Sequence, residues 1–232
     1  MFNPEKPIFN NSKSSTTENR SVEKYESGNI TFFPEDAKND IQIETAKKII
    51  EAISPYIETN VHVRYKRMKP ENPGFNSKLN PEFRDENYHD SIAINSDYQY
   101  QDELPFFLLH ELGHSLEEKL EKIIKEKGVE ALPAEDDNYA DFYADLIAVY
   151  ILKPELLKKL KDIPICQNTL SAIQEMFQNN DFKELRMKLN EAFGQEVALD
   201  DKQKIEREKR LAKLFERVFS KINEHIKQQK VN

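Results

Sequence analysis

The pattern of hydrophobic and polar positions divides the first half of the chain into one helix and two short strands. Apolar residues recur at helical spacing from residue 41 to residue 53, with Asp36 as a candidate N-cap and Pro55 as the end of the pattern. The segments VHVRY (residues 61–65) and SIAIN (from Ser91 to Asn95) are rich in β-branched residues, and each predicts a strand. Prolines and a glycine between them predict a loop.

The second half of the chain is helical in pattern. Residues 104–127 predict one helix whose leucines face inward, and Gly128 is a typical stop. Residues 136–152 predict a second helix, which Pro154 ends. From Leu211 to Ile226 an apolar stripe runs between charged faces, which predicts a long C-terminal helix that packs on one side.

These elements predict one α+β domain with two appendages. Residues 1–35 are expected to form a poorly ordered N-terminal arm, because the polar stretch at residues 10–20 has no apolar periodicity. Residues 36–195 would form the domain, with a small mixed β-sheet and a helical part. Residues 196–232 would form a charged amphipathic C-terminal helix.

Composition narrows the classes of function. The 232 residues carry a net charge of −8, which argues against nucleic acid as a partner because phosphate contacts need clustered lysine and arginine. No apolar run approaches the roughly 20 residues of a membrane span, and the first residues lack the apolar region of a signal peptide. We therefore expect a cytoplasmic protein without membrane contact, although export without a signal would leave the same pattern. A single cysteine, Cys166, excludes a cysteine-based metal cluster.

The motif HELGH at residues 110–114 carries the candidate chemistry. His110 and His114 are four residues apart, so on a helix they lie one turn apart on the same face and can bind one Zn²⁺. Glu111 lies about 100° around the helix from His110, where its carboxylate can act on a water beside the metal without binding the metal itself. This arrangement is typical of metal-assisted hydrolysis with a glutamate general base. Gly113 costs helix stability, which indicates that a neighbouring backbone approaches closely there.

Zinc hydrolases use three protein ligands and keep one position open, so a third donor is expected downstream. The helix predicted at residues 136–152 presents Asp137, Asp141 and Asp145 on one face. A carboxylate near a helix start is common for electrostatic reasons, which weakens the case for Asp137. Acidic groups among apolar neighbours, as at Asp141 and Asp145, are usually paired or metal-bound. Spacing alone does not choose among the three.

Two families resemble this part of the chain. The segment DFYADLIAVYILKP, which begins at Asp141, resembles the ExxAxxxxAxxLLxP signature of the ImmA/IrrE-type metallopeptidases, and NYADFYAD (residues 138–145) is similar to the NEAEFFAE stretch of the lethal-factor-type toxin peptidases. The resemblance covers about residues 90–155. It implies a zincin-like fold of the gluzincin type, with Asp141 as third zinc ligand and Asp145 supporting a zinc-binding histidine. The chain departs from both families in having Asp where they have Glu.

Zinc peptidases also need a group that stabilises the oxyanion of the reaction, often Tyr, His or Arg. Tyr139 and Tyr143 in the predicted ligand helix, and His89 before SIAIN, are candidates for this role or for substrate contact. Tyr88 and Tyr98 are further candidates, and the sequence does not rank them.

The sequence thus predicts a zinc-dependent endopeptidase in which His110, His114 and Asp141 hold Zn²⁺ and Glu111 is the general base. SIAIN is a candidate edge strand along which an extended peptide adds by β-augmentation. The resemblance implies a specific protein target rather than general digestion. Two alternatives remain open: a catalytically silent zincin-fold regulatory or interaction module, and a metallohydrolase that acts on non-peptide amides or esters.

Overall fold

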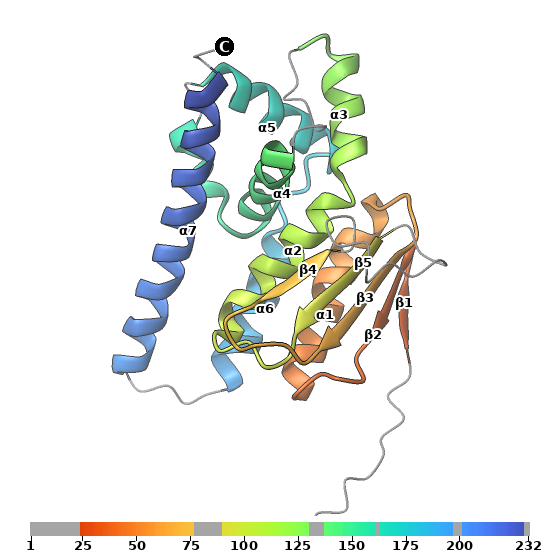
Figure 1. Ribbon diagram of the computed structural model, residues 1–232, viewed down its shortest axis with the longest axis vertical. Helices are drawn as coiled ribbons and strands as arrows, with labels where there is room; N and C mark the ends of the chain where they lie inside the picture. Colours follow the sequence, from red (N-terminus) through yellow and green to blue (C-terminus); the bar gives the residue numbers. More distant parts are fainter. Residues whose placement is uncertain (1–23, 77–89, 130–136, 161–162, 197–200, 230–232) are drawn as a thin grey trace, which may run out of the picture.

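The computed structural model describes residues 24–76, 90–129, 137–160, 163–196 and 201–229, and it shows an α+β fold (Figure 1). Within these residues five strands form one small mixed sheet in the order β1-β2-β3-β5-β4. β2, β3 and β5 are parallel, whereas β1 and β4 run antiparallel to their neighbours at the two edges. The strands are β1 (Tyr25–Ser27), β2 (Ile30–Phe33), β3 (Val61–Lys66), β4 (Gly74–Asn76) and β5 (Asp90–Asn95).

Helices account for most of the remaining described residues. α1 and α2 contact each other and the sheet, α4 packs along α2, and the long α7 runs along one side of the molecule against α4 (Figure 1). The helices are α1 (Asp40–Ile53), α2 (Leu104–His114), α3 (Glu117–Glu126), α4 (Asp137–Leu152), α5 (Pro164–Met176), α6 (Lys183–Glu196) and α7 (Asp201–Gln229), with the 3-10 turns η1 (Ser54–Tyr56), η3 (Gln101–Glu103) and η4 (Pro154–Leu160).

The first helix begins four residues later than the candidate cap Asp36. Asn39 caps α1, because its side-chain oxygen accepts a hydrogen bond of 2.9 Å from the backbone N–H of Gln42. Ile49 and Ile50 are fully buried, which fixes the apolar face of α1 in the core. The helical spacing was thus predicted, but the choice of cap was wrong.

The expectation of a disordered arm over residues 1–35 is wrong for its C-terminal part. β1 and β2 lie there, and Ile30 and Phe32 are fully buried. Ile30 pairs with Val61 of β3, so β2 belongs to the domain. A strand of four residues is too short for its alternation to be told from an isolated apolar patch. The rest of the expected arm, residues 1–23, lies outside the described residues.

The segment SIAIN forms a strand as predicted, but not at an edge. β5 pairs with β3 on one side and with β4 on the other, and all six of its residues are buried. A strand covered on both faces is typical of the interior of a sheet with parallel pairs. β4, three residues within the predicted loop, occupies the edge instead.

The helix predicted over residues 104–127 is divided into α2 and α3. The N–H of Ser115 bonds to the carbonyl of Leu112, and the N–H of Leu116 bonds to that of Gly113, so three-residue bonds end α2 directly after His114. α3 then leaves in a new direction (Figure 1). This break brings Glu117, the first residue of α3, next to His114.

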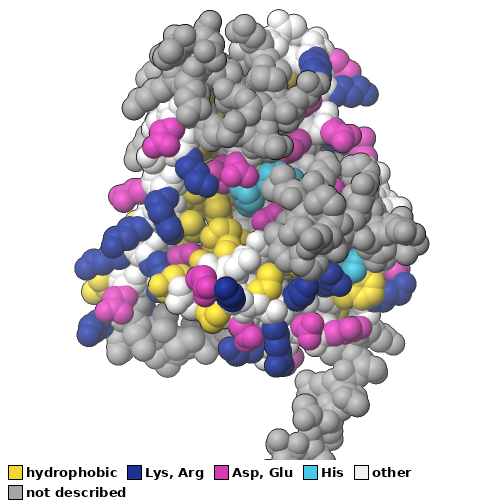
Figure 2. All heavy atoms as spheres, viewed as in Figure 1, with side chains coloured by type: hydrophobic (Ala, Val, Ile, Leu, Met, Phe, Trp, Pro, Cys, Tyr) yellow, Lys and Arg dark blue, Asp and Glu magenta, His cyan; other side chains and the backbone are white. Residues whose placement is uncertain are grey.

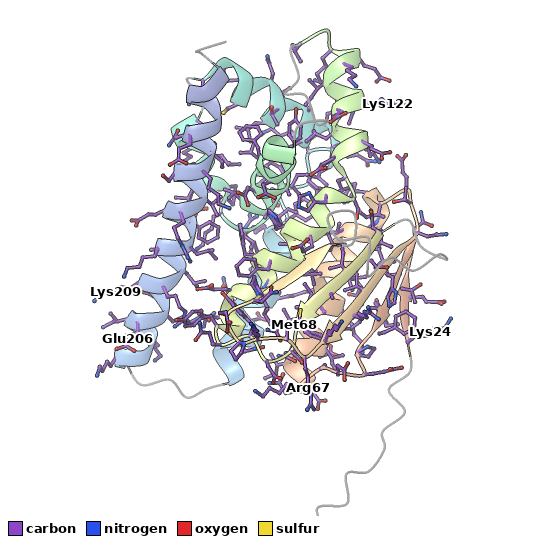
Figure 3. All side chains as sticks on the ribbon, in the orientation of Figure 1. Lys24, Arg67, Met68, Lys122, Glu206 and Lys209 are labelled. Carbon is purple, nitrogen blue, oxygen red and sulfur yellow. The ribbon has the colours of Figure 1, made fainter. Side chains whose placement is uncertain are left out.

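The two later helices follow the sequence prediction closely. α4 covers residues 137–152, and α7 covers most of the expected C-terminal helix, of which residues 197–200 and 230–232 lie outside the described chain. Charged side chains of α7 such as Glu206 and Lys209 point away from the other helices (Figure 3). Leu214, Phe215 and Val218 of the same helix are buried. None of the described helices is long and apolar enough to cross a membrane.

Candidate metal centre

Helices α2 and α4 bring three candidate ligands together. His110 and His114 follow each other on one face of α2, and the Nε2 atoms of their rings lie 3.7 Å and 3.8 Å from Oδ1 of Asp141 on α4. The three donor atoms lie within 4.8 Å of one another. Donors in a tetrahedral zinc site, each about 2.0–2.2 Å from the ion, are about 3.3–3.6 Å apart, so the observed triangle is slightly wider than a zinc site.

The contact between the two helices explains how an aspartate reaches the histidines. A Cβ on Gly113 would lie only 2.8 Å from the backbone Cα of Ala144, so α2 and α4 approach more closely than any larger residue at position 113 allows. This confirms the close approach that the glycine predicted. A close approach of the two helices thus accompanies the shorter aspartate at position 141.

Each histidine is held from behind by a carboxylate. Nδ1 of His110 lies 2.9 Å from Oδ1 of Asp145, and Nδ1 of His114 lies 2.6 Å from Oε1 of Glu117. A carboxylate at Nδ1 favours the tautomer with its proton there, which turns the lone pair of Nε2 toward Asp141. This donor set therefore fits a metal ion: two oriented imidazoles and one carboxylate, each presenting a lone pair to the same point.

The structure distinguishes two of the three aspartates that the sequence left open, Asp141 and Asp145. Asp141 faces the two Nε2 atoms, whereas Asp145 bonds to the opposite side of the His110 ring. Asp145 also raises the pKa of His110, against the lowering effect of burial. The side chain of Asp137 lies outside the description. The geometry agrees with Asp141 as ligand and Asp145 as support.

Sequence reasoning missed Glu117. The only available signal was its position three residues after His114, which is common for any pair of helical side chains. The break between α2 and α3 places it at Nδ1 of His114, and a continuous helix was expected there.

Glu111 lies near the two histidines and Asp141, and its pKa is raised. Its side chain is buried, with 8 % of its surface exposed. Burial raises the pKa of Glu111, and the negative charge of Asp141 adds to this, whereas His110 and His114 lower it. A carboxylate with a raised pKa is a better proton acceptor than an ordinary glutamate, which suits a general base.

Of the remaining candidates, the structure describes the side chains of Tyr143 and Tyr98. Tyr143 is fully buried and lies two residues from both Asp141 and Asp145, on the opposite side of α4, so its burial gives no support to a contact with substrate. Tyr98 is buried as well, and its hydroxyl donates to Glu103 at 2.9 Å. His89 lies outside the described residues, as does the side chain of Tyr139.

The cluster opens to solvent on the face shown in Figure 2. Histidine side chains lie in a hollow there, with acidic side chains beside them and hydrophobic side chains bordering them. The His114 side chain is 2 % exposed and that of Asp141 is 43 % exposed, so the donors are reached from the Asp141 side. No protein-family model, curated protein or solved structure matches this chain. The chemistry of the donor set is therefore the basis for any functional assignment.

Proposed function

We propose that this protein is a zinc-dependent endopeptidase. The observation that carries the proposal is the meeting of His110, His114 and Asp141 around one point with the buried carboxylate of Glu111 beside them. Three ligands and a carboxylate that does not bind the metal are what metal-assisted hydrolysis requires. A zincin-like fold accords with this set, and so does the small mixed sheet packed against α2.

The residues of the metal centre would have three different roles. His110, His114 and Asp141 would hold the ion, and Asp145 and Glu117 would keep the two rings oriented. The zinc ion, once bound, would act as a Lewis acid on the substrate carbonyl and on a water. Glu111 would accept the proton of that water and pass it to the leaving amine, which its raised pKa favours.

An extended peptide suits the site better than a small metabolite. β4 forms the edge of the sheet nearest to α2, and within the described residues only β5 pairs with it. A peptide that pairs with the outer side of β4 would add a strand to the sheet beside the HELGH helix. β4 therefore replaces SIAIN as the proposed binding strand. We still propose that the substrate is a specific protein.

The test is cleavage of a mixed peptide library by the zinc-loaded protein, read by mass spectrometry, with Glu111→Gln as the matched variant. The variant keeps the size of the side chain and all three ligands, so it should still bind zinc. We expect its rate to fall by about 10²–10⁴-fold, as for loss of a general base.

Three results would contradict the proposal in different ways. Equal cleavage by both proteins would place the activity elsewhere, in a contaminant or a second site. Stoichiometric zinc binding without cleavage of peptides would favour a silent module, and turnover of small esters alone would favour a non-peptide hydrolase.

A further inference from the structure

Asp141 has a charged neighbour that the sequence did not indicate. Nζ of Lys221, on α7, lies 4.0 Å from Oδ2 of Asp141, while Oδ1 of the same carboxylate faces the Nε2 atoms of His110 and His114. The two carboxylate oxygens are thus divided: one faces the imidazoles and the other faces the ammonium group. Lys221 lies far along the chain from Asp141, on a helix that begins only at Asp201.

The backbone of α7 is well placed to hold Lys221 at this point. Ile222 is fully buried and Val218 is 5 % exposed, so the helix is anchored next to Lys221 on both sides. The Lys221 side chain is 60 % exposed, with its charged end in solvent. The buried Ile222 therefore fixes the backbone position from which the Lys221 ammonium group reaches Asp141, although the lysine side chain itself is exposed.

The other two candidate ligands each have a partner of this kind. Asp145 holds His110 at 2.9 Å and Glu117 holds His114 at 2.6 Å, both on the atom that faces away from the cluster. An imidazole is oriented by an acceptor, whereas a carboxylate is oriented by a cation or donor at its second oxygen. Lys221 places an ammonium group 4.0 Å from that oxygen, which is the distance of an ion pair and not of a hydrogen bond.

We propose that Lys221 is a positioning residue for Asp141: its ammonium group attracts Oδ2 and leaves Oδ1 for the metal. The proposal rests on the proposed function, because it requires a metal at His110, His114 and Asp141. It assigns to α7 a part in the metal centre, where the sequence indicated only a solvated amphipathic helix.

Metal affinity alone is a poor readout of this role. The pair is exposed, so its contribution is small, and removal of the ammonium group also removes a repulsion toward the dication. The two effects oppose each other, and we expect the dissociation constant to change by less than about threefold. The coordination of the metal should change more clearly, since a carboxylate without its outer partner is free to rotate or to bind through both oxygens.

The experiment therefore uses Co²⁺, whose visible absorption reports coordination number and geometry. The full-length protein, Lys221→Met, Lys221→Arg and the control Lys213→Met, an exposed lysine of the same helix, are titrated with Co²⁺ alone. We expect a shift and a loss of intensity of the absorption in Lys221→Met. Lys221→Arg should restore the wild-type spectrum, because it returns a cation to Oδ2, and Lys213→Met should match the wild type.

Three results would overturn the proposal. If Lys221→Met gives the wild-type spectrum, Lys221 does not position Asp141, and the metal site itself stands. If Lys221→Met binds Co²⁺ more than about tenfold tighter with an unchanged spectrum, Lys221 acts only as a competing charge. If the wild-type protein binds no Co²⁺, the proposed function fails together with this inference.

Discussion

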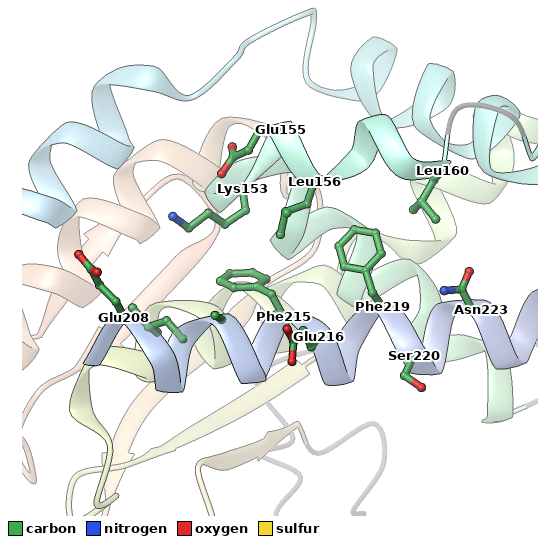
Figure 4. Close-up of a pocket in the computed structure, with 12 residues that line it drawn as sticks. Lys153, Glu155, Leu156, Leu160, Glu208, Phe215, Glu216, Phe219, Ser220 and Asn223 are labelled. Atoms are coloured by element: carbon green, nitrogen blue, oxygen red, sulfur yellow. The ribbon is translucent and has the colours of Figure 1, made fainter. Parts of the chain in front are cut away.

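The pair α2–α4 and the pair α7–η4 are packed in opposite ways. α2 and α4 meet backbone to backbone, since a Cβ on Gly113 would lie 2.8 Å from the Cα of Ala144. Between α7 and η4 the apolar side chains do not meet closely, and a groove of about 790 Å³ remains (Figure 4). The groove is bordered by Leu156, Leu160 and Phe219, and none of the metal-centre residues lines it.

This difference indicates that the α2–α4 contact sets the positions of the three donor atoms of His110, His114 and Asp141, the ligand triangle, whereas α7 only adjusts them. Ligand positions must hold to a few tenths of an ångström, and close-packed helices with a glycine at the crossing provide that. α7 is instead fastened by Arg210, whose guanidinium contacts both oxygens of Asp102 at 2.6 Å, and by a row of buried apolar residues. We therefore expect changes at the α2–α4 contact to weaken metal binding strongly and changes under α7 to affect mainly stability.

The largest effect is expected for Gly113→Ala. The added methyl group meets a backbone atom of α4, which cannot move aside without moving Asp141. The free energy of unfolding should fall by about 1–3 kcal/mol, as for other overpacked sites, despite the higher helix propensity of alanine. Zinc binding, measured by competition with a chelator, should weaken by more than tenfold.

Ser115→Ala is the control, because it lies at the end of the same helix and adds no atoms. Adding Ala144→Gly to Gly113→Ala should not restore zinc binding, since the nearest obstacle is the Cα of residue 144 and not its side chain. Wild-type zinc affinity in Gly113→Ala would show that the close approach does not position Asp141.

A smaller effect is expected for Asp145→Asn and Glu117→Gln. Each change keeps the shape of the side chain but removes the negative charge that favours a proton on Nδ1 of its histidine. Loss of such a partner typically lowers metal affinity by about 10–100-fold. Isothermal titration with Zn²⁺ measures the change for each variant.

The two variants also test the residue that the sequence did not indicate. Glu118→Gln removes the same charge from the next, exposed position of α3 and should leave zinc affinity unchanged. If Glu117→Gln behaves like Glu118→Gln, the contact of Glu117 with His114 has no role in metal binding.

The parts of the fold that the sequence predicted are those with long periodic patterns. α1, α4 and α7 each repeat an apolar stripe over several turns, so their presence and approximate limits were predictable. β1, β2 and β4 have three or four residues each, too few for a clear pattern. β2 and β4 become strands by pairing with β3 and β5, further along the chain, and β1 by pairing with the neighbouring β2. The end of α2 at His114 depends on tertiary contacts that no local pattern reveals.

The candidate site shows the same limit. His110, Glu111 and His114 share one short motif with a fixed helical geometry, so their grouping was predictable from spacing. The spacing left Asp137, Asp141 and Asp145 as candidate third ligands. The resemblance favoured Asp141, and the distances to His110 and His114 agree with it. Glu117 offered only the weak signal of its position three residues after His114, and Lys221 depends on where α7 lies in space, which the sequence near the motif does not indicate.

The smallest effect is expected for Arg210→Ala, which loosens α7 without touching the ligands. Arg210 contacts Asp102 and lies 3.5 Å from the buried carboxylate of Glu103, so its loss should cost about 1 kcal/mol of unfolding free energy at neutral pH. Burial raises the pKa of Glu103, and Arg210 opposes this by stabilising the ionised form.

The cost of Arg210→Ala should therefore depend on pH. Without Arg210 the folded-state pKa of Glu103 rises further, which destabilises the fold above that pKa and not below it, where Glu103 is protonated in the folded protein. Urea unfolding at several pH values should show the difference from wild type shrinking as the pH falls, while the exposed control Lys209→Ala shows none. Zinc affinity should remain within about threefold of wild type, because Ile222 still anchors α7 beside Asp141. A tenfold loss of zinc affinity would mean that α7 sets the ligand triangle as much as the α2–α4 contact does.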